Sequence, residues 1–107
     1  MIVLVTKLRI KNVLKIPTFL LLGMKAVGEA KKAKGNLHTA ITSGGLYEKY
    51  SMTVWESEKD MLAYTQNGAH KKAMDKALEL VNDIKVSYWK SDHIPEWEEV
   101  FERLEKV

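Results

Sequence analysis

The fold is decided by the stretch Tyr47–Leu80, whose sequence is YEKYSMTVWESEKDMLAYTQNGAHKKAMDKALEL. Its first ten residues alternate, so that one side of a strand would carry Tyr50, Met52 and Val54 and the other Ser51, Thr53 and Trp55. Ser57 then stands where a helix cap is expected, with Asp60 three residues later in an approximate capping box. A helical pattern follows, is interrupted at Asn67-Gly68, and resumes over residues 69–81. The stretch therefore predicts a strand followed by a helix that is broken at a glycine.

The flanking segments extend this pattern to a complete domain. Upstream, the patterns predict a strand over residues 2–10, a helix over 17–34 and a strand over 37–43, with Gly44-Gly45 as a tight hairpin turn. Downstream, they predict a strand over 84–90 and a short amphipathic helix opened by Asp92 and Pro95. The order β-α-β-β-α-β plus a terminal helix is that of a ferredoxin-like α+β fold. Residues 1–107 are expected to form one such domain, with a four-stranded antiparallel sheet and both long helices on one face.

Composition limits the class of protein. A hydrophobic share of 46% and a charged share of 29% over 107 residues are typical of an ordinary soluble globule. The absence of cysteine excludes disulfides and thiolate chemistry, so a cytoplasmic localisation is expected. No apolar run approaches the ~20 residues that span a bilayer, and no membrane partner is expected. The basic residues are scattered, the net charge is only +3, and the three histidines are far apart, so neither nucleic acid nor a multi-ligand metal site is expected.

The predicted sheet has a second face that the two long helices cannot cover. Its first strand, residues 2–10, is apolar on both sides, and this second face would also carry a large aromatic such as Trp55 or Trp89. An exposed apolar surface of that size usually marks an interface. We therefore expect a homodimer in which two copies pack their open sheet faces together about a twofold axis. The terminal helix would cover a sheet edge or reach over the partner.

Four short segments resemble the dimeric α+β barrel superfamily. They are Gly35–Leu37, the T-S-G-G turn at 42–45, the T-V-W-E-S run at 53–57 and the A-H-K-K-A run at 69–73. The closest resemblance is to the spheroidene monooxygenase-like branch, in which a strand ending in W-x-S precedes a helix and a later H-x-x-A. Small antibiotic biosynthesis monooxygenases are similar more distantly. The resemblance implies a barrel-like dimer with a cavity between sheet and helices in each subunit, and either oxygenation of a polycyclic or polyene substrate or handling of heme.

His70 is the principal candidate for chemistry. Ala73, Met74 and Ala77 follow it at helical spacing, which places it along an apolar stripe, and it falls in the first turn after Gly68, where the helix dipole disfavours the imidazolium. A neutral imidazole that faces a cavity can move a proton or ligate heme iron. The alternative is a histidine with a structural role, bonded to a backbone carbonyl.

Six further residues are candidate contacts for a small hydrophobic ligand. They are the wall residues Trp55 and Tyr64, the helix residue Met74, and the strand residues Thr6, His38 and Thr53. The resemblance to heme-degrading members of the superfamily is incomplete, because Tyr64 stands at the position of their tryptophan, Met74 stands at that of their ligand histidine, and the first strand lacks their asparagine. His70 lies one helical turn, about 5.4 Å, before the ligand position.

Three hypotheses follow. In the first, the protein is a monooxygenase-like oxidoreductase that acts on an apolar aromatic or polyene substrate without a cofactor, with His70 as the base. In the second, it is a non-catalytic dimer that binds heme or another hydrophobic ligand. In the third, it is a purely structural dimer. The expected cofactor is accordingly none or heme.

Overall fold

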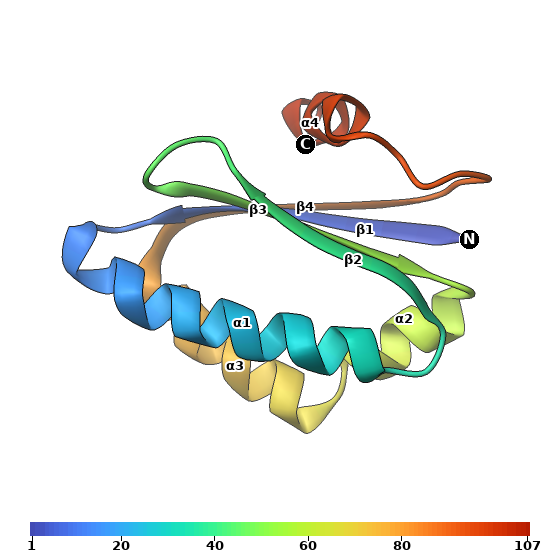
Figure 1. Ribbon diagram of the computed structural model, residues 1–107, viewed down its shortest axis with the longest axis horizontal. Coiled ribbons are helices and arrows are strands. Elements are labelled where there is room, and N and C mark those ends of the chain that lie inside the picture. The colour runs from blue at the N-terminus through green and yellow to red at the C-terminus, as the bar shows by residue number, and fades with distance from the viewer.

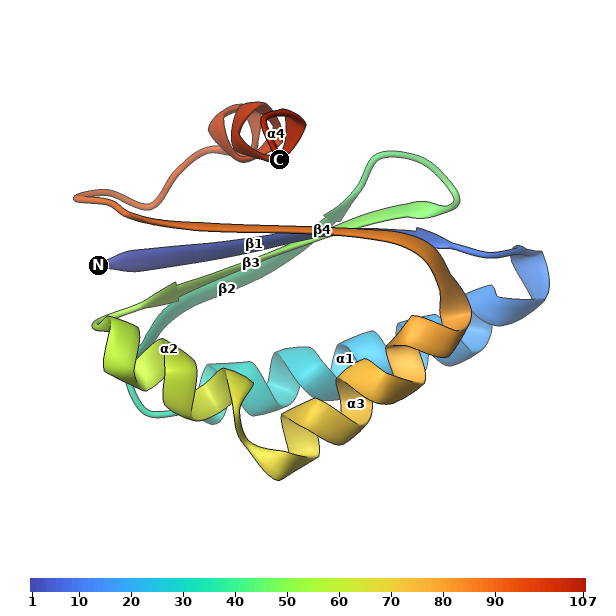
Figure 2. The ribbon, with the colours of Figure 1, turned by 180° about the vertical axis from the view of Figure 1, so that it is seen from behind.

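An antiparallel sheet separates two helical layers in the computed structural model of the protein (Figure 1). The structure describes residues 1–67 and 70–107 in full, and residues 68 and 69 only by their backbone, at the start of a helix. The sheet consists of β1 (Ile2–Ile10), β2 (Asn36–Ser43), β3 (Glu48–Trp55) and β4 (Val81–Lys90), in the spatial order β2-β3-β1-β4. One face carries α1 (Ile16–Lys32), α2 (Glu58–Thr65) and α3 (Gly68–Leu80), and a short 3-10 turn, η1 (Val13–Lys15), joins β1 to α1. On the opposite face lies α4 (Trp97–Glu105), as Figure 2 shows from behind.

This arrangement confirms the predicted α+β ferredoxin-like fold. The central strand β1 pairs with β3 and β4, both antiparallel, and β2 pairs with β3. Directly paired residues share a face of the sheet. The register therefore places Ile2, Leu4 and Thr6 on the side of α1–α3, and Val3 and Val5 on the side of α4.

The junction between β3 and α2 forms as the sequence predicts. The Ser57 hydroxyl accepts a hydrogen bond from the Asp60 backbone N–H at 3.2 Å and donates one to the Asp60 carboxylate at 3.1 Å. Gly35 has a φ of +83°, and a Cβ at this position would meet the Asp60 side chain. Gly35 is thus required both by its left-handed backbone and by the close approach of Asp60. Its carbonyl accepts from Glu56 N–H at 2.7 Å, which ties the start of β2 to the end of β3.

Buried side chains form separate clusters on the two sides of the sheet. On the α4 side, one cluster joins Val3, Val5, Met52, Val54, Val100 and Leu104. On the side of α1–α3, one cluster contains Ile2, Trp55 and Met61, and another contains Ile10, Phe19, Leu80 and Val81. The sheet is therefore buried from both sides within a single chain.

Three expectations need correction. The sheet face that was expected to be open carries α4, because that amphipathic helix buries Val100 and Leu104 against it. Trp89 packs on this face as expected, but Trp55 lies on the opposite side, among the residues that contact α2. The β2–β3 turn is a four-residue loop, residues 44–47, instead of a two-residue hairpin, and within it Gly45 has a φ of +149°.

Candidate functional site

Trp55, Tyr64 and His70 lie in a row between the sheet and the helices. The Trp55 ring lies 5.0 Å from that of Tyr64, and the Tyr64 ring lies 4.7 Å from the imidazole of His70, measured between centroids. Trp55 ends β3, Tyr64 belongs to α2 and His70 to α3, so three elements contribute to the row. Trp55 is fully buried and the other two side chains are half-buried. The break between α2 and α3 lets two successive helices present rings to the same strand end.

Hydrogen bonds fix the polar atoms of two members of this row. The Trp55 indole Nε1–H donates to Thr53 Oγ1 at 2.9 Å, and the Tyr64 hydroxyl donates to the Ala26 carbonyl of α1 at 3.3 Å. Among the fully described residues, no hydrogen-bond partner contacts the ring nitrogens of His70. Of the three side chains, His70 therefore retains polar atoms that can act on a ligand.

The environment keeps both titratable groups neutral. Burial lowers the pKa of His70, and the nearby Glu29 carboxylate opposes this only in part. Burial raises the pKa of Tyr64, and the same carboxylate adds to the effect. At neutral pH the row thus holds a neutral imidazole, which is the form that accepts a proton.

The remaining candidate residues divide between the two sides of the sheet. Thr6 and Thr53 are on the side of the row, and Met74 is half-buried on α3, one turn after His70. His38 is paired with Val54, whose side chain belongs to the cluster under α4, so His38 faces away from the row. The prediction that His38 lines the same cavity is therefore wrong. The cause is a register shift between Asn36 and His38, which changes the side on which the following residues of β2 lie.

The side of β1 that faces α1–α3 retains accessible surface. Leu4, Thr6 and Leu8 are half-buried, whereas Val3 and Val5 on the α4 side have no exposed surface. Next to Leu4 and Thr6 in register, Tyr88 and Val86 of the edge strand β4 are 57% and 46% exposed. The apolar surface between sheet and helices is consequently reachable along β4.

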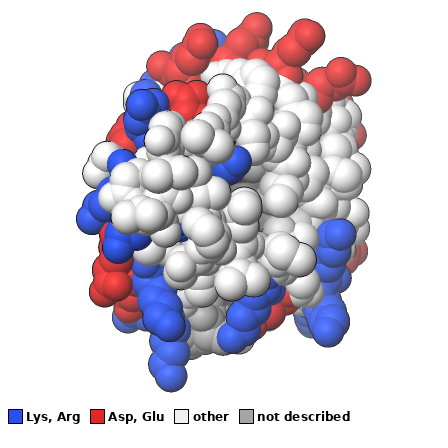
Figure 3. All heavy atoms as spheres, turned by 60° about the vertical axis from the view of Figure 1, so that its left-hand side comes forward, with Lys and Arg blue, Asp and Glu red and all other residues white. Residues whose placement is uncertain are grey.

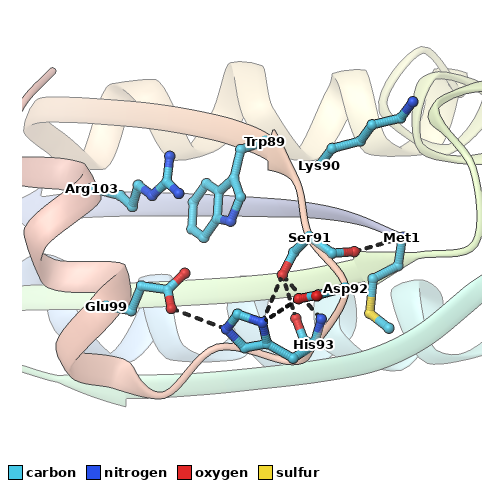
Figure 4. A pocket seen from close by; sticks show the side chains of 8 residues that line it. All are labelled: Met1, Trp89, Lys90, Ser91, Asp92, His93, Glu99 and Arg103. Atoms are coloured by element: carbon cyan, nitrogen blue, oxygen red, sulfur yellow. Dashed lines mark hydrogen bonds and ion pairs between the residues drawn. The ribbon is translucent and has the colours of Figure 1, made fainter.

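A second, more polar site lies at the other side of the sheet (Figure 4). A cleft of about 390 Å³ is lined by Met1, Trp89, Lys90, Ser91, Asp92, His93, Glu99 and Arg103. The imidazole of His93 lies between two carboxylates, 2.8 Å from Asp92 Oδ1 and 3.1 Å from Glu99 Oε1, and these raise its pKa. The Arg103 guanidinium lies over the Trp89 ring, 4.6 Å from its centroid. These contacts tie the loop after β4 to α4.

The sequence patterns do not predict this cleft. The signal in the sequence is weak, because Glu99 is six residues from His93 and belongs to α4, whereas His93 lies in the loop before that helix. Among the residues that the structure describes fully, no group of three side chains could hold a metal ion, either here or beside His70. The same residues include no helix that is long and apolar enough to cross a membrane.

Comparisons with known proteins support this fold. A family model described as a domain of unknown function, DUF3291, matches residues 23–107. No protein with curated functional information gives a significant match. Among solved structures, a proposed antibiotic biosynthesis monooxygenase from Deinococcus radiodurans superposes with a TM-score of 0.81 at 13% identity, covering 90% of this chain and 97% of that one.

Two other solved structures give similar values. A proposed antibiotic biosynthesis monooxygenase from Nitrosomonas europaea has a TM-score of 0.78 at 12% identity and covers 87% of this chain and 100% of that one. SnoaB, a cofactor-independent oxygenase from Streptomyces nogalater, has a TM-score of 0.75 at 8% identity and covers 89% and 97% of the two chains. At such identities the comparisons establish that these proteins share the ferredoxin-like α+β fold of this chain.

Proposed function

The chain belongs to the DUF3291 family of domains of unknown function, and we propose that it oxygenates a small apolar aromatic or polyene substrate. The substrate would lie between the sheet and α1–α3. The observation that carries this proposal is the row of Trp55, Tyr64 and His70. The polar atoms of the first two rings are hydrogen-bonded, whereas the imidazole nitrogens of His70 have no hydrogen-bond partner among the fully described residues. The accessible surface of Leu4 and Thr6 beside this row supports a place for an apolar ligand.

The proposed reaction needs little from the protein beyond binding and proton transfer. An electron-rich substrate with an activated CH₂ group gives up a proton to His70, and the resulting anion transfers an electron to O₂. One oxygen atom enters the substrate as a carbonyl, and the other leaves as water with the two hydrogens of the CH₂ group. The four electrons that reduce O₂ come from the substrate, so no cofactor enters the balance. Trp55 and Tyr64 would form the walls that orient the ring system.

The neutral imidazole fits the role of the base. A general base must be unprotonated at the working pH, and it works best when its pKa lies near that pH. Burial disfavours the charged imidazolium, and the Tyr64 ring shields one side of the imidazole from water. The SnoaB neighbour is named a cofactor-independent oxygenase, which agrees with a reaction of this kind.

The test is oxygen consumption with a tricyclic hydroxyaromatic ketone that carries an activated CH₂ group. We expect His70→Gln to lower the enzymatic rate by about 10²-fold or more, which is the usual contribution of a positioned base. His38→Gln is the matched control, because His38 is also half-buried but lies on the opposite side of the sheet. Equal rates for wild type and His70→Gln would contradict the assignment of the base.

Heme binding is the alternative for the same residue, since a half-buried neutral imidazole is also an axial ligand. Titration with hemin distinguishes the two functions. A Soret band that is lost in His70→Gln and kept in His38→Gln would favour a heme-binding module. If the wild-type protein does not shift the hemin spectrum, heme binding is excluded and oxygenation stays the proposed function.

We also propose that the protein is a cytoplasmic homodimer. Because α4 already covers Val3, Val5 and Val54, a second copy would have to contact the outer side of α4 and the adjoining part of β2, where His38 and Thr42 are half-buried. Alternatively, the two copies exchange their α4 helices across the sheet faces. Analytical ultracentrifugation at micromolar concentration tests this, and a monomer throughout would contradict the dimer.

A further inference from the structure

The outward side of η1 and α1 is an exposed apolar stripe, which we call the α1 patch. It consists of residues three or four apart: Leu14, Pro17, Leu21 and Met24. Leu14 is 83% exposed, Leu21 70% and Met24 71%. Residues with this spacing lie on one side of a helix, so the four side chains form a continuous surface.

The opposite side of the same helix is apolar as well. Phe19 and Ala30 are buried toward the sheet, and Leu22, Ala26 and Val27 are half-buried there. An amphipathic surface helix normally turns polar residues outward, and a helix that is apolar all round is normally buried. The first half of α1 breaks this rule, which indicates that another surface covers the α1 patch when the protein works.

Basic residues surround the α1 patch. Lys11 and Lys15 precede and border it, Lys25 follows Met24, and Lys31 and Lys32 continue the outward side at the end of α1; all five are exposed. The first 34 residues hold eight basic side chains and a single acidic one, Glu29. Figure 3, which brings this end of the molecule forward, shows a broad uncharged surface with lysine and arginine along its lower margin and acidic residues along its top.

We propose that the α1 patch docks on the surface of an anionic lipid bilayer. Its leucine and methionine side chains would enter the boundary between headgroups and acyl chains, and its lysines would pair with acidic headgroups. Lying on a membrane differs from spanning one, and the expectation of no membrane partner rested on the lack of a spanning segment alone. The inference is independent of the oxygenase proposal, because no residue of the patch belongs to the row around His70.

A second copy of the chain fits the α1 patch less well. A twofold contact between two α1 patches would bring lysines toward one another without carboxylates, since residues 1–28 contain no aspartate or glutamate. The acidic side chains of α4, Glu98, Glu102 and Glu105, would complement the lysines, but that contact joins unlike surfaces and gives a ring or an open-ended filament instead of a twofold dimer. An anionic bilayer satisfies both the apolar and the basic parts at once.

Co-sedimentation with vesicles tests the proposal. We expect wild type to bind vesicles of phosphatidylcholine mixed with phosphatidylserine much more tightly than vesicles of phosphatidylcholine alone, and the binding to weaken with salt. The double variant Leu21→Ser/Met24→Ser should weaken binding at least about tenfold, because burial of one such side chain is worth that much or more. Lys15→Gln and Lys25→Gln should each weaken it roughly fivefold.

Matched controls are Leu78→Ser and Lys72→Gln, which alter an exposed leucine and an exposed lysine on α3, outside the α1 patch. Neither should change binding, and circular dichroism should show the same fold for every variant. The proposal is overturned if wild type ignores both vesicle types or binds them equally. It is also overturned if the protein is a dimer in solution that Leu21→Ser/Met24→Ser converts to a monomer, since a second copy would then cover the patch.

Discussion

Each side of the sheet has one histidine with a shifted pKa, and the two pKa values are shifted in opposite directions. His70, beside Tyr64, is half-buried among rings, and burial lowers its pKa. His93, in the loop between β4 and α4, is held between Asp92 and Glu99 with 57% of its side chain exposed, and these carboxylates raise its pKa. The environment of His70 therefore favours the neutral imidazole, whereas the environment of His93, across the sheet, favours the imidazolium paired with carboxylates.

Packing differs between the same two sides. On the α4 side, Val3 and Val5 of the central strand β1 have no exposed surface. Toward α1–α3, the alternating residues of that strand remain partly accessible. Ligand sites are lined mostly by apolar side chains with a few polar groups, so the partly accessible apolar surface agrees with the ligand site that we propose on the His70 side.

The largest expected effect is on stability at the His70 side. Trp55→Ala should lower the free energy of unfolding by about 3–5 kcal/mol, because Trp55 is fully buried and the change leaves a large cavity. Urea denaturation followed by circular dichroism measures this. A loss below about 1 kcal/mol would mean that this side is too loosely packed to register the missing ring.

Leu104→Ala should cost less, about 2 kcal/mol, at the low end for buried leucines. Leu104 is buried under α4, but a terminal helix can shift toward the sheet and fill part of the space. Leu78→Ala, at a position that is 49% exposed, serves as control and should change the free energy of unfolding by less than about 0.5 kcal/mol. Equal losses for the two leucines would contradict the packing of α4 on the sheet.

His70 should make the protein less stable in acid. Its pKa in the folded state lies below the unfolded value of about 6.5, so the unfolded chain binds more protons below that pH and the free energy of unfolding falls as the pH drops toward the folded pKa. His70→Gln should flatten this slope. Urea denaturation of wild type and His70→Gln at several pH values measures this slope. The same slope in both proteins would mean that the His70 imidazole is fully solvated.

His93 should have the opposite and smaller effect. Its folded pKa lies above 6.5, so its ion pairs stabilise the fold at acidic pH and this contribution is lost as the pH rises through the folded pKa. The effect is small because the side chain is largely exposed to water. NMR titration of the imidazole carbons should show His93 titrating above His70, and the reverse order would refute the comparison.

Much of this architecture could be predicted from local signals. The alternation before Trp55 and the cap at Ser57 each depend on a few neighbouring residues, and each is seen in the structure. The position of α4 could not be predicted. Its pattern specifies which of its own residues are buried but not the surface that buries them, so the sheet face was expected to be open.

The candidate site was predictable only in part. Trp55, Tyr64 and His70 could each be selected from the sequence, but their contact depends on the turn between α2 and α3, which brings two helices to one strand end. The side of the sheet on which His38 lies depends on a one-residue shift in β2, and no pattern in that strand distinguishes its two sides. The α1 patch could not be predicted, because the leucines that point outward from α1 have the same helical spacing as those that point inward.

The central position of β1 has a consequence for how the chain folds. Ile2 pairs with Trp55 on one side and with Lys90 on the other, so β1 has no partner strand until β3, some 45 residues later in the chain, has been made. Pairings between such distant segments form slowly, because the entropy cost of closing a long loop comes before the pairing contacts that offset it. During that interval an apolar strand and the leucines of α1 are exposed together, and chaperone binding to the first 30 or so residues is the expected result.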